Sequence, residues 1–425
     1  MKKTLIISTW APPSIGGPKN MYALFSQLPT DSYSILTSYY GIDNYSAKHG
    51  EWLPGKYYFY DNSNVSDEQR DRTKLTKESN QRSAISKLRH LVKRIGLVKI
   101  ILGPLLIFGQ IMMIVKAGAK VIKKEKIEVL MGVSDFGPAL IGTYKLHKKT
   151  KIPFVIHLYD LYLGNLFPFP GGILAKYYEP KLIASASKII VTNETTKELY
   201  IKRYGEAVRE KFAVIHNSVP PEEHELSKTS VEYNPAPPYS ILFSGRIYWP
   251  QIEAIKEMIG AINEMNFEIT FNIYTPSPKD YLSKLGIIEN NKIKINSATP
   301  QEMPALQASA DILFLPLSWN TKAPEIIQTA TPGKLTDYLA TGKPILTYAP
   351  GDTALVKYVK NKQCAYIVEE HNPEKLKQAI EAIVTNKKES IALIENAGKA
   401  YLSDFDTKKN SLILSTLLNN FFTIS

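Results

Sequence analysis

ATPGKLTDYLATGKPIL, residues 330–346, carries the clearest local structural signals in the chain. Thr331 is of the type that caps a helix N-terminus, and Pro332 suits the first helical position. Gly342, followed closely by Pro344, is a signal that ends a helix. The stretch therefore predicts one short helix.

The charges on this predicted helix indicate a ligand. Lys334 lies in the first turn, where unpaired backbone N–H groups already create positive partial charge. A cation is unfavourable there unless an anion lies nearby, and a phosphate would resolve the conflict. Asp337 shares a face with Lys334, so a nucleotide could present a phosphate to the lysine and a ribose to the carboxylate. An ordinary surface helix with a solvated lysine is the alternative.

Length and composition describe a folded protein of several domains. A chain of 425 residues that is 44% hydrophobic and 22% charged suggests two or three globular domains. The single cysteine, Cys364, excludes an intramolecular disulfide and suits a reducing cytosol. The N-terminal MKKTLIISTW imitates a signal peptide, but its apolar run is short and meets Pro12 and Pro13. We therefore expect a first buried strand and a cytoplasmic protein.

The net charge of +12 is concentrated in residues 82–126, which contain many basic residues and a single acidic one, Glu125. Within this region, residues 83–101 place apolar side chains at helical spacing and so predict a basic amphipathic helix. Such a helix suits the anionic inner face of the cytoplasmic membrane as a peripheral contact. A buried helix with its charged end in water is the alternative. No nucleic-acid-binding module accompanies the charge, so nucleic acid is not an expected partner.

The apolar residues that follow, ILGPLLIFGQIMMIV, do not predict a transmembrane helix. Gly103, Pro104 and Gln110 interrupt them, and Lys99 and Lys116 bound a stretch shorter than the roughly 20 apolar residues that a span needs.

Short apolar runs alternate with helical patterns, which predicts parallel sheets built from strand–helix–strand units. The expected strands are residues 4–9, 129–134, 153–158 and 188–193, then 238–245, 267–275, 292–296, 311–317 and 344–349. A stretch rich in proline and charge, SVPPEEHELSKTSVEYNPAPP, separates the two groups and predicts a linker. We expect a first domain at 1–219, a linker at 220–237, a second domain at 238–400 and a C-terminal helix at 401–425 that crosses back to the first domain.

Candidate site residues follow the expected strands, because ligands of doubly wound sheets lie beyond the strand carboxyl ends, here in a cleft between two facing domains. Gly16 and Gly17 follow the first strand and would let the backbone approach a ligand, although a ligand-free turn is the alternative. This is not the G-x-G-x-x-G pattern of nicotinamide sites. His157 and Asp160 follow a later strand. Arg246 follows a strand of the second half, where its fork suits a diphosphate, with an interdomain salt bridge as the alternative.

The order of these motifs resembles the GT-B glycosyltransferases of the family 4 type. The resemblance covers nearly the whole chain and is carried by APPSIGG, the His157–Asp160 region, KIIVTNETTKELYIKRYG, VIHNSVP, FSGRI, EMPALQASADILFLPL and, most specifically, PGKLTDYLATGKPIL. It implies an α/β protein with two facing Rossmann-like, doubly wound domains. It also implies a nucleotide-sugar donor in the second domain, an acceptor in the first, retention of anomeric configuration, and neither a cofactor nor a metal.

The resemblance assigns donor contacts in the second domain. Asp337 matches the acidic position that binds the donor ribose, and Gly333 with Lys334 lies where the phosphates approach. Arg246 matches the arginine that neutralises the diphosphate. The backbone amides from Thr331 to Lys334 are expected to stabilise the same charge as the diphosphate departs.

The resemblance also assigns contacts in the first domain. Gly16 and Gly17 match the glycine loop over the donor site. A histidine or aspartate is expected at the acceptor and the reacting sugar, and the register between His157 and Asp160 is open. We expect His157 to contact the sugar and Asp160 to act as a base or a positioning group.

Three positions depart from the family pattern. Thr329 occupies the position of the second glutamate of the E-x7-E pattern, and Glu325 is a candidate to reach the sugar hydroxyls instead. Gln251 replaces the lysine usually found beyond the strand arginine, and Ser218 stands where glycine is common. These departures bear on donor affinity and sugar identity more than on the fold.

The expected function is a retaining, metal-independent glycosyltransferase of the hexosyltransferase type. The basic region 82–126 suggests a lipid-linked or polysaccharide acceptor of envelope glycan assembly. A sugar-nucleotide epimerase of the same fold is one alternative, and a non-catalytic scaffold, favoured by Thr329 and Gln251, is another. A D-x-D pattern at Asp404 and Asp406 precedes the last predicted helix and follows no strand, so a metal-dependent transferase is not favoured. No motif specifies the base, the sugar or the acceptor.

Overall fold

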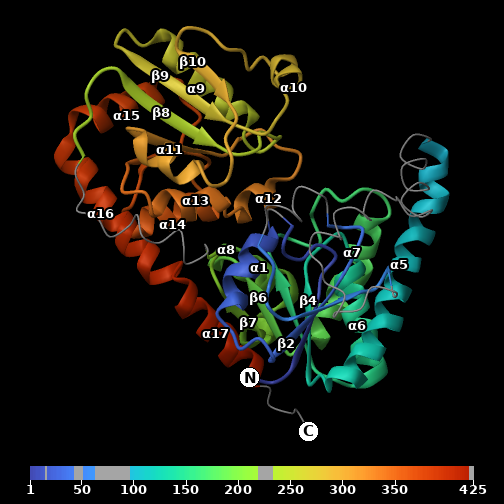
Figure 1. The fold of residues 1–425 in the computed structure, drawn as a ribbon. Coiled ribbons are helices and arrows are strands. Elements are labelled where there is room, and N and C mark those ends of the chain that lie inside the picture. Colours follow the sequence, from blue (N-terminus) through green and yellow to red (C-terminus); the bar gives the residue numbers. More distant parts are fainter. Residues whose placement is uncertain (15–16, 43–50, 63–95, 219–232, 421–425) are drawn as a thin grey trace. The chain divides into compact units, whose positions relative to one another are not determined.

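The computed structural model describes residues 1–14, 17–42, 51–62, 96–218 and 233–420 (Figure 1). It divides the chain into two compact units. Unit 1 comprises Met1–Pro220 with Thr407–Ser425, and unit 2 comprises Pro221–Asp406. Three expectations from the sequence lie wholly or mostly outside the described residues: the role of Gly16, the amphipathic helix at 83–101 and the linker at 220–237.

Unit 1 is built on a seven-stranded parallel sheet in the order β3-β2-β1-β4-β5-β6-β7. Its strands are β1 (Thr4–Ile7), β2 (Tyr33–Thr37), β3 (Lys56–Phe59), β4 (Val129–Val133), β5 (Phe154–Leu158), β6 (Lys188–Val191) and β7 (Phe212–Val214). The strand order reverses beside β1, which pairs with both β2 and β4. A reversal of this kind opens a crevice at the strand carboxyl ends, which is where ligands bind such sheets.

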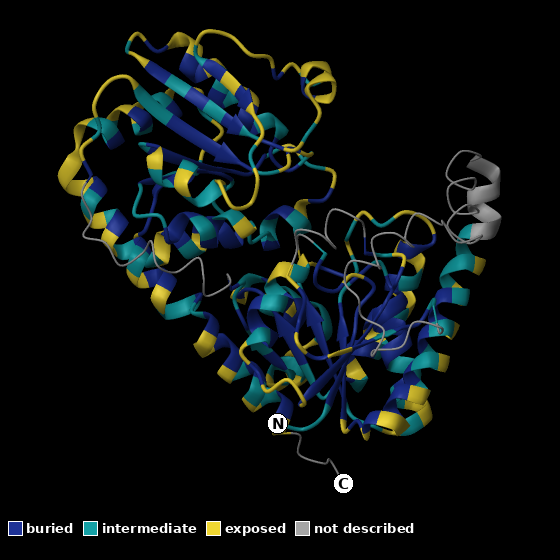
Figure 2. Cartoon of the chain, in the orientation of Figure 1, coloured by how far each residue is buried: buried dark blue, intermediate teal, exposed yellow. Residues whose placement is uncertain are grey.

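Helices cover both faces of this sheet, which explains why its strands are apolar on both sides (Figure 2). One face packs against α5 (Gly96–Glu125), α6 (Pro138–Thr150), α7 (Gly171–Ser185) and α8 (Glu194–Tyr204). The other packs against α1 (Gly17–Ser26) and α17 (Thr407–Asn419). A 3-10 helix, η2 (Glu206–Lys211), precedes β7.

The C-terminal helix belongs to unit 1. Leu414 and Leu418 of α17 are fully buried in the core that α1 covers, and the Ser411 hydroxyl donates a 2.7 Å hydrogen bond to the Leu24 carbonyl of α1. This helix begins at Thr407 and not at the expected residue 401, because the preceding helix, α16 (Lys387–Asp404), continues within unit 2.

Unit 2 is built on a six-stranded parallel sheet in the order β10-β9-β8-β11-β12-β13. Its strands are β8 (Tyr239–Ser244), β9 (Ile269–Tyr274), β10 (Ile293–Asn296), β11 (Ile312–Pro316), β12 (Ile345–Tyr348) and β13 (Tyr366–Val368). The order reverses beside β8, which pairs with β9 and β11. The residues that follow β8 and β11 therefore lie where a ligand is expected.

The helices of unit 2 are mostly short. They are α9 (Ile252–Glu264), α10 (Lys279–Lys284), α11 (Met303–Ser309), α12 (Pro324–Thr329), α13 (Gly333–Leu339), α14 (Ala354–Lys362), α15 (Pro373–Thr385) and α16. The amphipathic helices α9 and α15 bury their apolar faces on the sheet in one hydrophobic core. Asn372 caps α15 by accepting hydrogen bonds from the N–H groups of Glu374 and Lys375.

The structure confirms the α/β class and the two Rossmann-like domains. All nine strands expected from the sequence are present, shorter by one or two residues at their ends. Four further strands, β2, β3, β7 and β13, were not expected.

Candidate functional site

Unit 1 contains a pocket of about 580 Å³ at the carboxyl ends of β1, β4 and β5. Every residue that lines it belongs to unit 1. Its wall includes the aromatic side chains of Trp10, Phe136, Tyr159 and Phe167 and the polar side chains of Ser14, Ser134, Asp135, Asp160 and Asn165. Apolar and aromatic walls with a few polar groups are typical of pockets for organic ligands, sugars included.

An aromatic platform borders this pocket. The Trp10 side chain is 45% exposed although it is large and apolar, and its ring lies 5.6 Å from the Phe136 ring at 56°. The Ser8 hydroxyl fixes the local chain by donating a 2.6 Å hydrogen bond to the Trp10 carbonyl. An exposed aromatic face beside a pocket suits the C–H surface of a sugar ring.

Asp135 forms the polar floor of the pocket. It follows β4 and accepts hydrogen bonds from the N–H groups of Gly137 at 2.7 Å and Ala139 at 3.0 Å, so it satisfies two backbone donors at the start of α6. The Thr9 hydroxyl, which follows β1, donates to the same carboxylate. Burial raises the pKa of Asp135 to about 6 against the opposing effect of these hydrogen bonds. The carboxylate thus ties together the ends of two central strands.

The structure separates His157 from Asp160. Asp160 lines the pocket and is exposed, whereas His157 is only 1% exposed and is not part of the pocket wall. The His157 ring lies 4.2 Å from the Tyr159 ring and has no hydrogen-bond partner among the described residues. Burial lowers its pKa to about 3, so the ring is neutral. The expected contact between His157 and a sugar stays a prediction: Tyr159 and Asp160 occupy the pocket wall, and His157 lies behind them.

Gly17 is the described member of the predicted glycine loop. It is the first residue of α1 and lines the pocket, and a Cβ atom at this position would lie 3.8 Å from the Tyr159 ring. The glycine thus leaves the helix backbone bare at the pocket edge, and the close approach of a ligand to it stays a prediction.

The end of β8 and the start of α13 lie against each other in unit 2. Gly245 follows β8 with φ +115°, and a Cβ atom there would lie 2.8 Å from Cε of Lys334. The Lys334 ammonium lies 4.8 Å from the centre of the Phe243 ring. Arg246 comes next, is exposed, and forms no ion pair with any described residue. Lys334 therefore packs against the bare backbone at Gly245, and the residue that follows this glycine is cationic too.

Burial and a neighbouring negative charge shift the pKa of Lys334 in opposite directions. Burial lowers its pKa to about 8, and the negative charge of Asp337, one turn further along α13, partly opposes that change. Near neutral pH the ammonium is charged but poorly solvated, a state that an incoming anion would relieve. This agrees with the shared face that the sequence predicted for these two residues.

The start of α13 differs from the expected one. Its N-cap residue is Pro332 and its first helical residue is Gly333, with no side-chain capping hydrogen bond, so Thr331 is not the N-cap. Proline has no N–H group and Gly333 has no side chain, so the first turn is sterically open. The other end is as predicted, because Gly342 has φ +69°, which glycine adopts without strain.

Two departures from the family pattern have local structural roles. The Thr329 hydroxyl donates a 2.7 Å hydrogen bond to the Glu325 carbonyl one turn earlier in α12, and Thr329 is buried. Gln251 is also buried, and its side-chain oxygen accepts from the Tyr248 N–H at 3.4 Å in the turn before α9.

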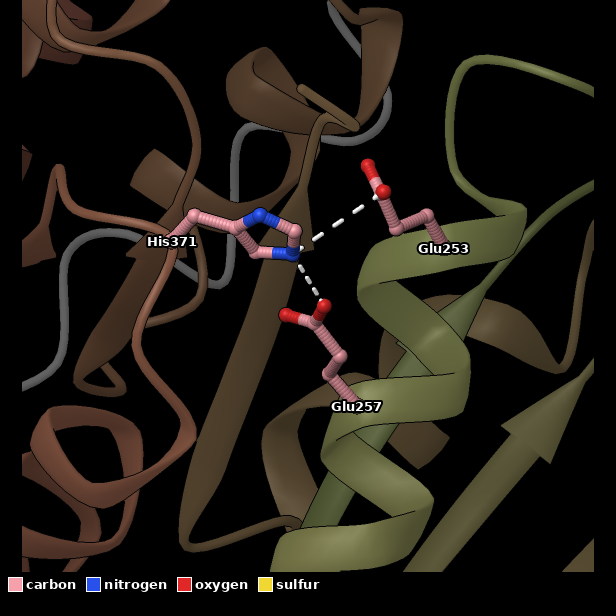
Figure 3. A group of neighbouring side chains, drawn as sticks. All are labelled: Glu253, Glu257 and His371. Atoms are coloured by element: carbon pink, nitrogen blue, oxygen red, sulfur yellow. Dashed lines mark hydrogen bonds and ion pairs between the residues drawn. The ribbon is translucent and has the colours of Figure 1, made fainter. Parts of the chain in front are cut away.

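One group of side chains in unit 2 has metal-ligating chemistry. Glu253 and Glu257, one turn apart on α9, face His371 from the loop after β13 (Figure 3). Each side chain also has a structural partner: Glu253 accepts from the Trp319 N–H at 2.8 Å, the Tyr348 hydroxyl donates to Glu257, and the His371 ring stacks on Trp319. The D-x-D residue Asp404 likewise binds Tyr358 at 2.9 Å and Lys362 at 2.7 Å.

Comparison with protein families identifies the chain. Residues 238–386 match the model of the glycosyl transferases group 1, and residues 79–223 match that of Glycosyltransferase Family 4. The two matches together cover more than half of the chain. The chain therefore belongs to the GT-B glycosyltransferases of the group 1, family 4 type. A comparison with curated protein sequences gave no match.

Solved structures share the fold at low sequence identity. A glycosyltransferase from Rickettsia africae is 15% identical, with 99% of each chain covered and a TM-score of 0.64. Sucrose-phosphate synthase from Thermosynechococcus elongatus is 11% identical, with 100% of each chain covered and a TM-score of 0.64. HepE from Anabaena, solved with UDP-glucose, is 13% identical, covers 99% of this chain and 100% of its own, and has a TM-score of 0.60. At these identities the likeness shows the fold.

Sequence reasoning missed several pocket residues of unit 1. Trp10, Asp135 and Tyr159 each lie within three residues of the end of a central strand, in the stretches STW, SDF and HLYD. A polar or aromatic side chain directly after a predicted parallel strand was the signal that could have found them.

Proposed function

We propose that this glycosyltransferase moves a sugar, of the hexose class, from a nucleoside diphosphate to an acceptor hydroxyl with retention of configuration. The observation that carries the proposal is the poorly solvated Lys334 ammonium packed against Gly245, the residue before Arg246, whose guanidinium pairs with no acid among the described residues. Asp337, one turn on, offers a carboxylate to the ribose. HepE from Anabaena, which shares the fold, was solved with UDP-glucose and with UDP, which supports a donor of this class.

The charge that builds on the departing diphosphate is balanced, in this proposal, by the side chains of Arg246 and Lys334 and by the backbone N–H groups of Thr331, Gly333 and Lys334; Pro332 has no N–H to contribute. Preorganised positive charge and positioning supply most of the rate enhancement that such a transfer needs. We propose no metal or cofactor in this step. Turnover that is unchanged by millimolar EDTA supports this, and turnover abolished by EDTA and restored by a divalent cation contradicts it.

The acceptor is assigned to the pocket of unit 1. Trp10 and Phe136 offer a platform for a sugar ring, and Asp160 stands at the wall as a base or positioning group for the attacking hydroxyl. The neutral, buried His157 supports the Tyr159 ring from behind. Glu325 of α12 remains a candidate contact for the donor sugar hydroxyls.

The test of the donor site is calorimetry of the purified protein against UDP, GDP, ADP, dTDP and NAD. Tight binding of one nucleoside diphosphate, weakened at least tenfold in both Arg246→Ala and Asp337→Ala, supports the proposal and names the nucleotide. No binding of any of them contradicts it and favours a non-catalytic scaffold. An altered nucleotide sugar, formed without acceptor, would instead indicate a sugar-nucleotide epimerase of the same fold.

A membrane-linked acceptor is supported by α5. Gly103–Glu125 is long and apolar enough to cross a bilayer, although a helix packed on a protein core can share that composition. Leu105 and Phe108 are 62% and 56% exposed on α5, and Gly103 lies near the backbone of Phe169, another exposed aromatic residue. We propose a cytoplasmic protein that docks this apolar surface on the inner face of the cytoplasmic membrane to reach a lipid-linked or polysaccharide intermediate of envelope glycan assembly.

The membrane proposal is tested by sedimentation with liposomes that contain anionic lipid. Leu105→Ser with Phe108→Ser should release the protein into the supernatant, whereas Leu412→Ser, at an exposed position on α17, should leave it bound. A wild-type protein that does not sediment contradicts membrane docking and leaves the donor proposal intact.

A further inference from the structure

A buried carboxylate in unit 1 holds the chain segment that forms one wall of the pocket. Glu179 of α7 is 1% exposed, and its side chain accepts four hydrogen bonds. The donors are the Leu163 N–H at 2.6 Å, the Tyr200 hydroxyl at 3.2 Å, the Arg203 guanidinium at 2.9 Å and the Tyr204 hydroxyl at 2.7 Å. Three of these donors come from α8 and the fourth comes from the segment between β5 and α7.

The same group of residues holds that segment at two further points. The Arg203 guanidinium also donates to the Leu163 carbonyl at 3.2 Å, so Leu163 is held at both its N–H and its carbonyl. The Tyr200 hydroxyl lies 3.3 Å from the Tyr162 N–H, which donates to it. The backbone of Tyr162 and Leu163 is therefore fixed to α7 and α8 by charge-assisted and buried hydrogen bonds.

The residues on either side of this fixed backbone line the pocket. Tyr159, Asp160 and Leu161 precede it, and Asn165 and Phe167 follow it. The Asn165 side chain donates a 3.1 Å hydrogen bond back to the Leu161 carbonyl, so the segment closes on itself across the fixed point. A displacement at Leu163 would move Asp160 and Asn165 together.

We infer that Glu179, with Arg203, is a positioning residue for the acceptor: it sets where the Asp160 carboxylate and the Asn165 amide stand in the pocket. Neither Glu179 nor Arg203 lines the pocket, so each acts through the segment 159–167. The inference rests on the proposed assignment of the acceptor to this pocket. A buried ion pair that only stabilised the fold would have no need to contact the pocket wall. This one forms hydrogen bonds with the backbone of that wall.

The test compares Glu179→Gln with Glu198→Gln in the full-length protein. Glu198 lies on α8, the helix that carries Arg203, and pairs with Arg209 at 2.6 Å, but that pair is exposed and does not reach the segment 159–167. Tyr204→Phe, which removes a single hydrogen bond to Glu179, is the milder variant to use where Glu179→Gln does not fold.

The first readout is hydrogen exchange at the amides of Tyr162 and Leu163. Exchange at least tenfold faster in Glu179→Gln, about threefold faster in Tyr204→Phe and unchanged in Glu198→Gln is expected, with β1 and β4 unchanged throughout. Exchange at these two amides within twofold of wild type, or an equal acceleration across all strands, would overturn the inference.

The second readout is transfer from UDP-glucose to octyl β-glucoside. We expect the KM for octyl β-glucoside to rise about tenfold in Glu179→Gln while the KM for UDP-glucose stays within twofold. Equal increases in both constants, or no increase in either, would overturn the positioning role. A wild-type protein that neither transfers glucose nor binds any nucleotide sugar contradicts the proposed function, and the exchange measurement then still decides whether Glu179 fixes the segment.

Discussion

The binding of a nucleoside diphosphate should weaken as pH rises through about 8, because Lys334 loses its proton there. Burial lowers the pKa of Lys334 to about 8 in the free protein, and a bound diphosphate should return it to about 10 or above by supplying the missing counter-charge. At pH 7 about 90% of the free protein then carries the charged lysine, and at pH 9 only about 10% does. Binding at pH 9 must therefore take up a proton.

The expected effect is a rise in Kd of about tenfold between pH 7 and pH 9, or about 1.4 kcal/mol. Isothermal titration calorimetry in two buffers of different ionisation enthalpy measures both the Kd and the proton uptake. Lys334→Arg should abolish the pH dependence, because a guanidinium stays charged throughout this range. Asp337→Asn should shift the midpoint to lower pH, because Asp337 opposes the lowering of the lysine pKa.

A Kd that is constant from pH 7 to pH 9 in the wild type would refute the assignment of Lys334 to the diphosphate. So would an equal pH dependence in Lys334→Arg, because the titrating group would then lie elsewhere.

Three further substitutions test other parts of the structure. Gly245→Ala should weaken diphosphate binding by tenfold or more in calorimetry, because its Cβ atom would lie 2.8 Å from Cε of Lys334 and the backbone has φ +115°. Trp10→Ala should raise the acceptor KM about tenfold and leave the melting temperature within about 2 °C, since nearly half of Trp10 is already exposed to solvent. Asp135→Asn should be stabilised relative to wild type as pH rises: the difference in free energy of unfolding between variant and wild type should change by about 2 kcal/mol in favour of the variant from pH 4.5 to pH 7.5, measured by urea titration. The folded-state pKa of Asp135, about 6, exceeds the ordinary value of 3.8. The stabilisation that protonated Asp135 gives the folded wild type is therefore complete below pH 3.8 and is lost as pH rises through 6.

The fold was largely predictable because parallel strands buried on both faces are continuous apolar runs. The strands that the sequence analysis missed, β2, β3, β7 and β13, have between three and five residues, and β3, β7 and β13 lie at or near the ends of the sheets. The apolar signal of so short a segment resembles that of a helix turn or a loop. Their pairing is decided by the neighbouring strand, which the local sequence does not record.

The second-unit site was more predictable than the first-unit pocket. Lys334, Asp337 and Arg246 could be proposed as site residues because helix-terminus charge and strand-end position constrain each residue separately. The burial of His157 was not foreseen, and it follows from strand periodicity: Val155 and His157 lie on the face of β5 that α1 and α17 cover. The role of Glu179 could not be predicted, because it depends on contacts among α7, α8 and a segment without secondary structure.

The attachment of α17 to unit 1 determines the order in which the chain can be completed during synthesis. Unit 2 is continuous in sequence, whereas the α1 face of unit 1 stays uncovered until Leu414 and Leu418 have been made. Domains of most proteins fold from the N-terminus onward as they are synthesised. Here the first unit to be started is the last to be finished, so a fragment that ends at residue 220 would expose the apolar surface of α1.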